Sequence, residues 1–208
     1  PRIMPLGKGQ TKPLNVTKTA KHRIVVGLGW DPAHQPNLMG KVQALAQGKE
    51  IHHDLDLACH IFNPAHEPVD IISADPARAA DASGHIYHSG DSKEGLAEGD
   101  DEEISVELKG LPRTIHTLVF TAKISSGQTF EEISNPEIRL ADAYTNHNLL
   151  AASIHTDESA GHDLFVFCLI QRDEKDNWHV RNIADYEDMQ AIDDIDTYLS
   201  ALITKPAA

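Results

Sequence analysis

Apolar residues in this chain fall into short runs separated by turn residues. The clearest run, residues 104–108, alternates three aliphatic side chains with two polar ones, which is typical of a strand with one buried face. Residues 164–170 are apolar on both faces, so we expect a central strand covered on both sides. Strands are predicted over residues 22–30, 54–62, 104–108, 115–124, 136–144, 149–155, 163–171 and 177–184, with a short edge strand at 14–17.

Two segments depart from the strand pattern. Residues 39–49, rich in Gln and Ala, indicate a short helical insertion, and Thr129 opens a capping box that predicts one helical turn. A C-terminal helix is predicted over 188–203, because Met189, Ile192, Ile195, Leu199 and Leu202 recur at helical spacing. The fold class that follows is all-β: a β-sandwich of two mainly antiparallel sheets with short helical insertions and a C-terminal helix.

Composition and charge narrow the class of protein. The 208 residues include 32 acidic and 18 basic ones, a formal net charge of -14. This balance excludes nucleic-acid binding through a general basic surface and argues against direct docking on anionic lipid. Cys59 and Cys168 lie in apolar segments, and we expect them to be buried without a disulfide.

The chain carries no sign of membrane insertion. No apolar stretch reaches the roughly 20 residues of a membrane span, and the first residues lack a signal-peptide pattern. We therefore expect a cytoplasmic protein, although a secreted chain with its signal removed would look the same.

Carboxylates gather in three separate segments. Asp54 and Asp56 alternate with leucines, so both carboxylates share one face of a strand. A third carboxylate ends the apolar run 24–30, and an acidic, glycine-containing loop spans residues 90–102. If the fold brings these segments together, their like charges repel unless a cation binds. The candidate ligands are Asp31, Asp54, Asp56, Asp91, Asp100, Asp101 and Glu102.

These residue types favour a hard cation. Oxygen ligands dominate and no cysteine lies nearby in the sequence, so calcium fits better than zinc or copper. The negative charge of the seven carboxylates exceeds that of one divalent ion, which favours two ions. The spacing is not that of an EF-hand, so the site would be assembled from separated loops. The alternative is that these residues are solvated surface.

The acidic segments resemble the TerD-type tellurium-resistance and stress-response proteins. The matching elements are Gly27-Leu28-Gly29-Trp30-Asp31, Asp54-Leu55-Asp56, the loop from Gly90-Asp91 to Gly99-Asp100-Asp101-Glu102, Gly127-Gln128-Thr129-Phe130, Ile138-Arg139 and the strand pair 163–184. The resemblance implies a sandwich domain over 13–208 after an N-terminal extension of residues 1–12. It also implies two calcium ions on these carboxylates, no catalytic activity, a role in resistance to tellurite and other stress, and protein partners in a stress-response assembly that can be membrane-associated.

The chain departs from that family's pattern at several positions. Ser92, Glu94 and Ala97 stand where the family usually has Asn, Thr and Gly, and residues 33–50 look like an insertion. Asp75 occupies one position of the family's paired Asn, so the resemblance adds it to the candidate ligands as a charged replacement for an amide oxygen. These departures leave the fold alone and concern the second ion.

Two interpretations from other classes stay open. The same carboxylates could hold Mg²⁺ or Mn²⁺ and activate water in a hydrolase, or the domain could be an acidic interaction module without a metal. Ser125 and His162 lack the sequence context of a hydrolase nucleophile elbow. Trp30 and Trp178 are expected to pack against the core. Polar surface is the expectation for the histidines that invite a transition-metal site: His52, His53, His85 and His88.

Overall fold

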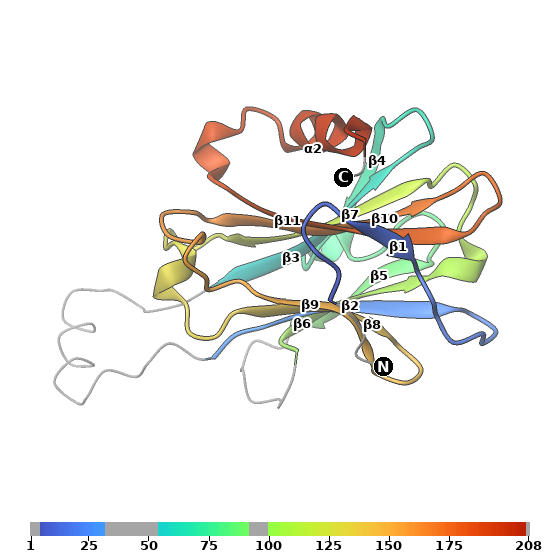
Figure 1. Ribbon diagram of the computed structural model, residues 1–208, viewed down its shortest axis with the longest axis horizontal. Coiled ribbons are helices and arrows are strands. Elements are labelled where there is room, and N and C mark those ends of the chain that lie inside the picture. The colour runs from blue at the N-terminus through green and yellow to red at the C-terminus, as the bar shows by residue number, and fades with distance from the viewer. Residues whose placement is uncertain (1–4, 32–53, 92–99, 207–208) are drawn as a thin grey trace, which may run out of the picture.

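The structure is a computed structural model that describes residues 5–31, 54–91 and 100–206. Two antiparallel sheets pack face to face, and one helix lies on the outer face of the larger sheet (Figure 1). Sheet A has the strand order β1-β11-β10-β7-β3-β4 and sheet B the order β5-β6-β2-β8-β9. The strands are β1 (Thr11–Pro13), β2 (Arg23–Gly29), β3 (Leu55–Phe62), β4 (Pro68–Ile72), β5 (Ile86–Asp91), β6 (Glu102–Glu107), β7 (Thr117–Ile124), β8 (Glu137–Asp142), β9 (Asn148–Ser153), β10 (Leu164–Arg172) and β11 (Trp178–Glu187). The predicted β-sandwich is confirmed.

The alternation of apolar and polar residues determines which side chains fill the space between the sheets. On β6, Ile104 and Val106 point inward and are fully buried, as are Leu55 and Leu57 on β3. Trp30 and Trp178 pack against this core, as predicted. Both cysteines are buried in it as free thiols, which confirms the prediction for them.

Strand β10 is covered on both faces, as its apolar run predicts. Phe165 contributes to the core between the sheets, whereas Leu164 and Val166 contribute to a second apolar cluster on the outer face of sheet A. A register shift between Val166 and Cys168 lets the consecutive residues Phe167 and Cys168 both lie in the inner core. The second cluster is completed by the C-terminal helix, so sheet A is buried on both sides.

The C-terminal helix is shorter than predicted. Residues 188–203 do not form one helix: a short 3-10 helix, η4 (Met189–Ala191), precedes α2 (Ile195–Thr204). The reason is that two aspartates cap separate starts, because Asp188 accepts a hydrogen bond from the Gln190 amide and Asp194 accepts one from the Asp196 amide. The capping box at Thr129 is confirmed, since it opens the 3-10 helix η3 (Phe130–Glu132).

Other boundaries sharpen or correct the sequence predictions. The edge strand expected at 14–17 lies instead at β1, where Thr11 pairs with Arg181 of β11. Strands β4 and β5 were not predicted, since polar residues and short length hide their pattern. Two further 3-10 helices, η1 (Pro76–Arg78) and η2 (Leu108–Gly110), lie in connections. The predicted helix at 39–49 and the predicted insertion at 33–50 fall outside the described residues. In the described part of the chain, the longest helix is too short to span a membrane.

Candidate functional site

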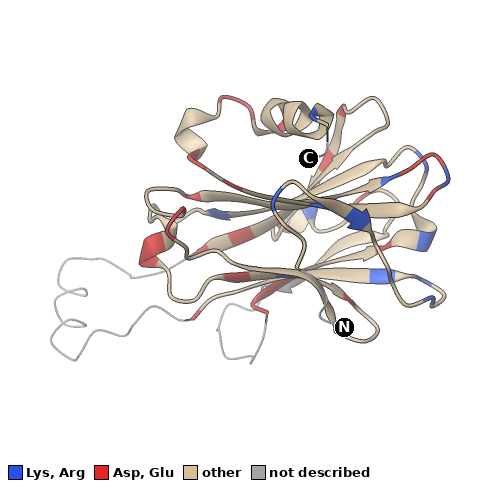
Figure 2. Ribbon diagram, viewed as in Figure 1, with Lys and Arg blue, Asp and Glu red and all other residues tan. Residues whose placement is uncertain are grey.

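Several acidic residues lie at one end of the sandwich, the left-hand end in Figure 2. Strand β2 ends there, and β3 and β6 begin there. Leu28 of β2 and Asp91 of β5 both lie opposite Glu102 of β6 in the ladder. We call this end of the sandwich, whose strand ends and turns carry Asp31, Asp54, Asp56, Asp101 and Glu102, the acidic end. The sequence expectation that separated segments converge holds for the strand ends that carry these residues.

Asp101 fixes the turn that follows β2. Its side chain is buried, and Oδ2 accepts a hydrogen bond from the Trp30 amide at 2.9 Å. Its own amide donates to the Leu28 carbonyl at 2.8 Å. Asp31, the next residue along, is exposed and accepts a hydrogen bond from the Asn135 side-chain amide at 2.6 Å. Asp101 therefore holds the backbone immediately before Asp31 in place.

Glu102 lies inside the sandwich and links its two sheets. His88 Nε2 of β5 is 2.9 Å from Glu102 Oε1, and the Leu57 amide of β3 donates to Oε2 at 3.4 Å. The side chains of His88 and Glu102 are 1% and 2% exposed. Burial raises the pKa of Glu102 and the Asp56 charge adds to this, while His88 and the Leu57 N–H oppose it. The expectation that His88 is polar surface is wrong, because it lies on the inward face of β5 with Ile86.

Asp54 and Asp56 lie beside a loop that the sequence did not connect with them. Ser125 Oγ donates a hydrogen bond to Asp56 Oδ2, and Ser126 Oγ accepts one from the Asp54 amide at 3.0 Å. The loop is placed there because the end of β7 pairs with the start of β3, Ile124 opposite Leu55. The pairing of β3 with β7 is the signal from which these two serines could have been predicted to lie here. The loop adds hydroxyl oxygens to the carboxylates of the acidic end.

Asp100 lies on the outer face of sheet B rather than with these carboxylates. Arg139 donates from Nε to both carboxylate oxygens at 3.1 Å and from Nη2 to Oδ2 at 2.7 Å. The carboxylate sits directly over Gly27, where a Cβ atom would come within 2.2 Å of it. Burial raises the pKa of Glu103, and its side-chain hydrogen bond to Asp100 raises it further, whereas Arg139 lowers it. Asp100 therefore anchors the start of β6 through an ion pair.

The remaining candidates are placed less centrally. Asp75 is exposed and caps η1, where its Oδ1 accepts a hydrogen bond from the Ala77 amide at 3.0 Å. The Asp91 backbone ends β5, and its side chain is outside the described part of the structure, as are His52 and His53. Within the ranges that the structure describes, no three His, Cys, Asp or Glu side chains are grouped so that they could hold a metal ion.

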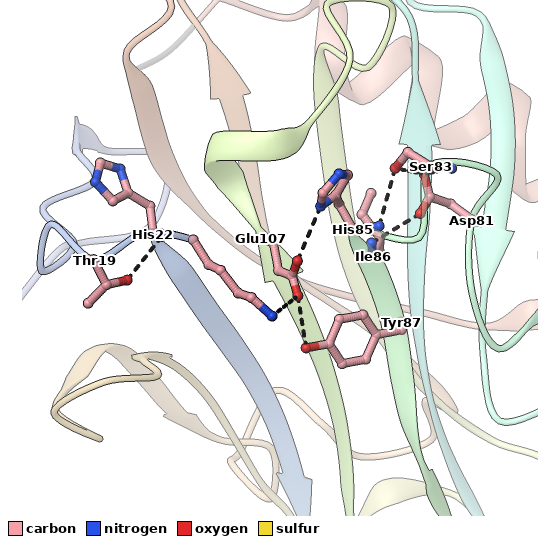
Figure 3. Close-up of polar contacts among 9 residues, drawn as sticks. Thr19, His22, Asp81, Ser83, His85, Ile86, Tyr87 and Glu107 are labelled. Atoms are coloured by element: carbon pink, nitrogen blue, oxygen red, sulfur yellow. Dashed lines mark hydrogen bonds and ion pairs between the residues drawn. The ribbon is translucent and has the colours of Figure 1, made fainter.

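A second polar cluster occupies the opposite end of sheet B (Figure 3). Glu107 at the end of β6 accepts hydrogen bonds from His85 Nδ1 and Tyr87 Oη, each at 3.2 Å, and Lys21 Nζ is 3.6 Å away. Burial by itself would raise the pKa of Glu107, but His85, Lys21 and Tyr87 outweigh it, so the pKa is lowered. The His85 ring occupies the space over Gly110. This cluster joins the loop before β2 to strands β5 and β6.

Comparison with known proteins identifies the family. The TerD domain profile matches residues 3–192. The chain belongs to the TerD family. It is 33% identical over 140 residues to tellurium resistance protein TerZ of Serratia marcescens, covering 67% of this chain and 69% of that one. It is 29% identical over 163 residues to general stress protein 16U of Bacillus subtilis, covering 74% and 76%.

Solved structures share the fold. The crystal structure of a homologue of telluride resistance protein TerD from Streptomyces coelicolor A3(2) superposes with a TM-score of 0.66. That match covers 88% of this chain and 98% of the other at 23% identity. This TerD-family chain therefore has the sandwich architecture of that homologue, and its relatives are named for tellurium resistance and general stress.

Proposed function

We propose that this TerD-family protein is a calcium-binding, non-catalytic module of a stress-response system. The names of its relatives support a role in stress and tellurium resistance. The observation that carries the calcium proposal is the proximity of Asp56 on sheet A to buried Glu102 on sheet B. The charge of Asp56 raises the pKa of Glu102. A divalent cation at this end would remove that repulsion.

The proposed ligands come mainly from the acidic end. Asp54 and Asp56, with Ser125 and Ser126 beside them, offer the oxygen donors that calcium prefers. Asp31, Asp91, Asp101 and Glu102 complete the proposed set. Asp100 and Asp75 stand outside its centre, because Arg139 already pairs with the first and a helix cap engages the second. We retain both as candidates for the second of two ions.

When bound, calcium would cancel charge among these segments and stabilise the folded state, because it binds that state preferentially. A protein partner in a cytoplasmic stress-response assembly would then bind the ordered acidic end. That assembly can be associated with the membrane. Neither relative described above carries a name that indicates hydrolysis, so no observation favours the hydrolase.

Isothermal titration calorimetry with Ca²⁺ and with Mg²⁺ tests the proposal. The wild type should bind Ca²⁺ in preference to Mg²⁺, and Asp56→Asn should weaken Ca²⁺ binding about tenfold or more, equivalent to at least ~1.4 kcal/mol. Glu174→Gln is the matched control, since it removes one negative charge at an exposed position of the opposite β10–β11 turn. Absence of Ca²⁺ binding by the wild type would refute the proposal. Survival of tellurite by cells carrying each variant then tests the stress role separately.

A further inference from the structure

The C-terminal helix covers an apolar area on the outer face of sheet A. Leu199, Leu202 and Ile203 of α2 are buried against this face. The sheet contributes Phe62, Val119, Leu164, Val166, Leu169 and Ile183 to the same cluster. Figure 1 shows α2 lying above β7 and β10, with β4 beside it, and the segment that contains η4 joins it to β11. The helix is therefore a separate layer, and this contact area supplies its apolar attachment to the sheet.

A histidine lies beneath the N-terminal turn of that helix. His60 of β3 is 5% exposed, and its Nε2 is 3.2 Å from Thr121 Oγ1 of β7. Its Nδ1 is 3.6 Å from Asp196 Oδ1 of α2. Neither Nδ1 of His60 nor Oδ1 of Asp196 has a hydrogen-bond partner, although both atoms are buried. Two unpartnered polar atoms thus face each other between helix and sheet.

Protonation of the imidazole would turn this contact into an ion pair. A neutral imidazole can donate from Nδ1 to Asp196 while Nε2 accepts from the Thr121 hydroxyl, whereas the cation donates from both nitrogens and adds a positive charge beside the Asp196 carboxylate. The attraction between the two charges adds to the hydrogen bond, and the 26% exposure of the Asp196 side chain limits its size. We propose that His60 and Asp196 form a pH-sensitive latch that holds α2 on sheet A more tightly when His60 is charged.

The surroundings of His60 support assigning the pH response to this pair. From β7 the facing group is Thr121, which does not titrate in this range, and from β4 the paired residue is Ile71. From α2 it is Asp196, the charged group whose contact with His60 the structure records. The latch should therefore weaken when a rise in pH removes the charge of the imidazolium.

The other polar ties of α2 do not use a histidine side chain. Tyr198 Oη donates to Glu187 at 3.1 Å, and Ser200 Oγ donates to the His66 carbonyl at 2.7 Å. These ties keep the helix near the sheet when the latch is weak. A rise in pH should therefore increase local opening of α2, and with it transient exposure of the apolar cluster, before the sandwich unfolds.

Amide hydrogen exchange between pH 5.5 and 8, corrected for the intrinsic exchange rate and referenced to β7, tests the latch. Protection of residues 195–204 in the wild type should fall about fivefold over this range, in keeping with a partly exposed ion pair. Asp196→Asn and His60→Gln should remove that dependence. Asp193→Asn, which removes an exposed charge just before the helix, should keep it.

The outcomes decide the proposal in either direction. If Asp196→Asn keeps the wild-type pH dependence of α2, or if the wild type shows none, the latch does not exist. Should His60→Gln fold poorly, Asp196→Asn still decides, because its side chain is 26% exposed and Asp194 supplies the helix cap. Calcium binding is not involved in this test.

Discussion

Strand β6 forms two glutamate–histidine pairs, one with His88 of β5 and one with His85 just before β5, near opposite ends of the sandwich. Glu102 lies 2.9 Å from His88 in the interior, and Glu107 lies 3.2 Å from His85 at the surface. The two glutamate side chains differ in exposure, 2% against 12%. The same two residue types thus lie in different surroundings.

The pKa values of the two glutamates move in opposite directions. Burial dominates at Glu102, so its pKa is raised despite His88. At Glu107, burial is outweighed by His85, Lys21 and Tyr87, so its pKa is lowered. The comparison teaches that a histidine partner does not by itself stabilise a carboxylate. The direction of the pKa shift depends on the balance between the loss of solvent around the carboxylate and the number of groups that donate to it. At the acidic end, this balance favours a nearby positive charge.

Removing the histidines should give the largest contrast. His88→Ala leaves Glu102 buried without its side-chain partner and should reduce the free energy of unfolding by about 3–4 kcal/mol. His85→Ala at the surface should reduce it by about 1 kcal/mol or less, because Glu107 keeps Tyr87 and Lys21. Urea denaturation measures both. Equal losses would contradict the distinction between a buried and a surface pair.

Calcium should stabilise only through the acidic end. At a concentration about 100 times Kd, the gain should be ~2.7 kcal/mol, which raises Tm by about 5–10 °C. Glu102→Gln should lose most of this rise, whereas Glu107→Gln should keep it. Thermal melts with calcium, magnesium and chelator provide the measurement. A calcium effect that both variants reduce equally would place the ion elsewhere.

Crowding the His85 ring should perturb the surface pair alone. A Cβ at Gly110 would lie 2.2–2.6 Å from three ring atoms, so Gly110→Ala must turn the ring away from Glu107. We expect a loss of about 1 kcal/mol in the free energy of unfolding. The same substitution in a His85→Ala background should cost less, because the clash is gone. A full cost in that background would mean that the ring is not the obstacle.

The dependence of stability on pH should show the smallest effect, with opposite signs for the two glutamates. A raised pKa favours the protonated carboxyl in the folded state, so Glu102 costs stability as pH rises from the ordinary carboxyl range through its raised pKa. A lowered pKa does the reverse, so Glu107 costs stability as pH falls through its lowered pKa. The free energy of unfolding is measured against pH for the wild type, Glu102→Gln and Glu107→Gln. Each variant should lose the pH dependence that its own glutamate contributes.

The sequence predicted the sandwich because strand periodicity is a local property. Alternation at residues 104–108 and the doubly apolar run at 164–170 became β6 and β10 with little change in bounds. The helix prediction over 188–203 was too long, because apolar spacing continues across the two aspartate caps. Strand β5 was missed because His88 and Ser89 interrupt its apolar pattern.

The candidate site could be predicted only in outline. Which strand ends meet follows from the ladder, and the burial of Leu55 and Leu57 in the core follows from their alternation with Asp56. The partner of each carboxylate depends on residues distant in sequence: Arg139 for Asp100, His88 for Glu102 and Ser125 for Asp56. No local pattern encodes those choices, because they are made by sheet pairing and packing.

Both edges of sheet A end in a proline, and this has a consequence for aggregation. Pro13 closes β1 and Pro68 opens β4, and neither can donate a backbone hydrogen bond to an added strand. Such edges resist edge-to-edge pairing with another chain. Proteolytic loss of residues 1–13 would uncover β11, a ten-residue strand that β1 otherwise borders, as a new edge. Integrity of this short N-terminal segment should therefore govern how long concentrated solutions of the protein stay free of aggregates.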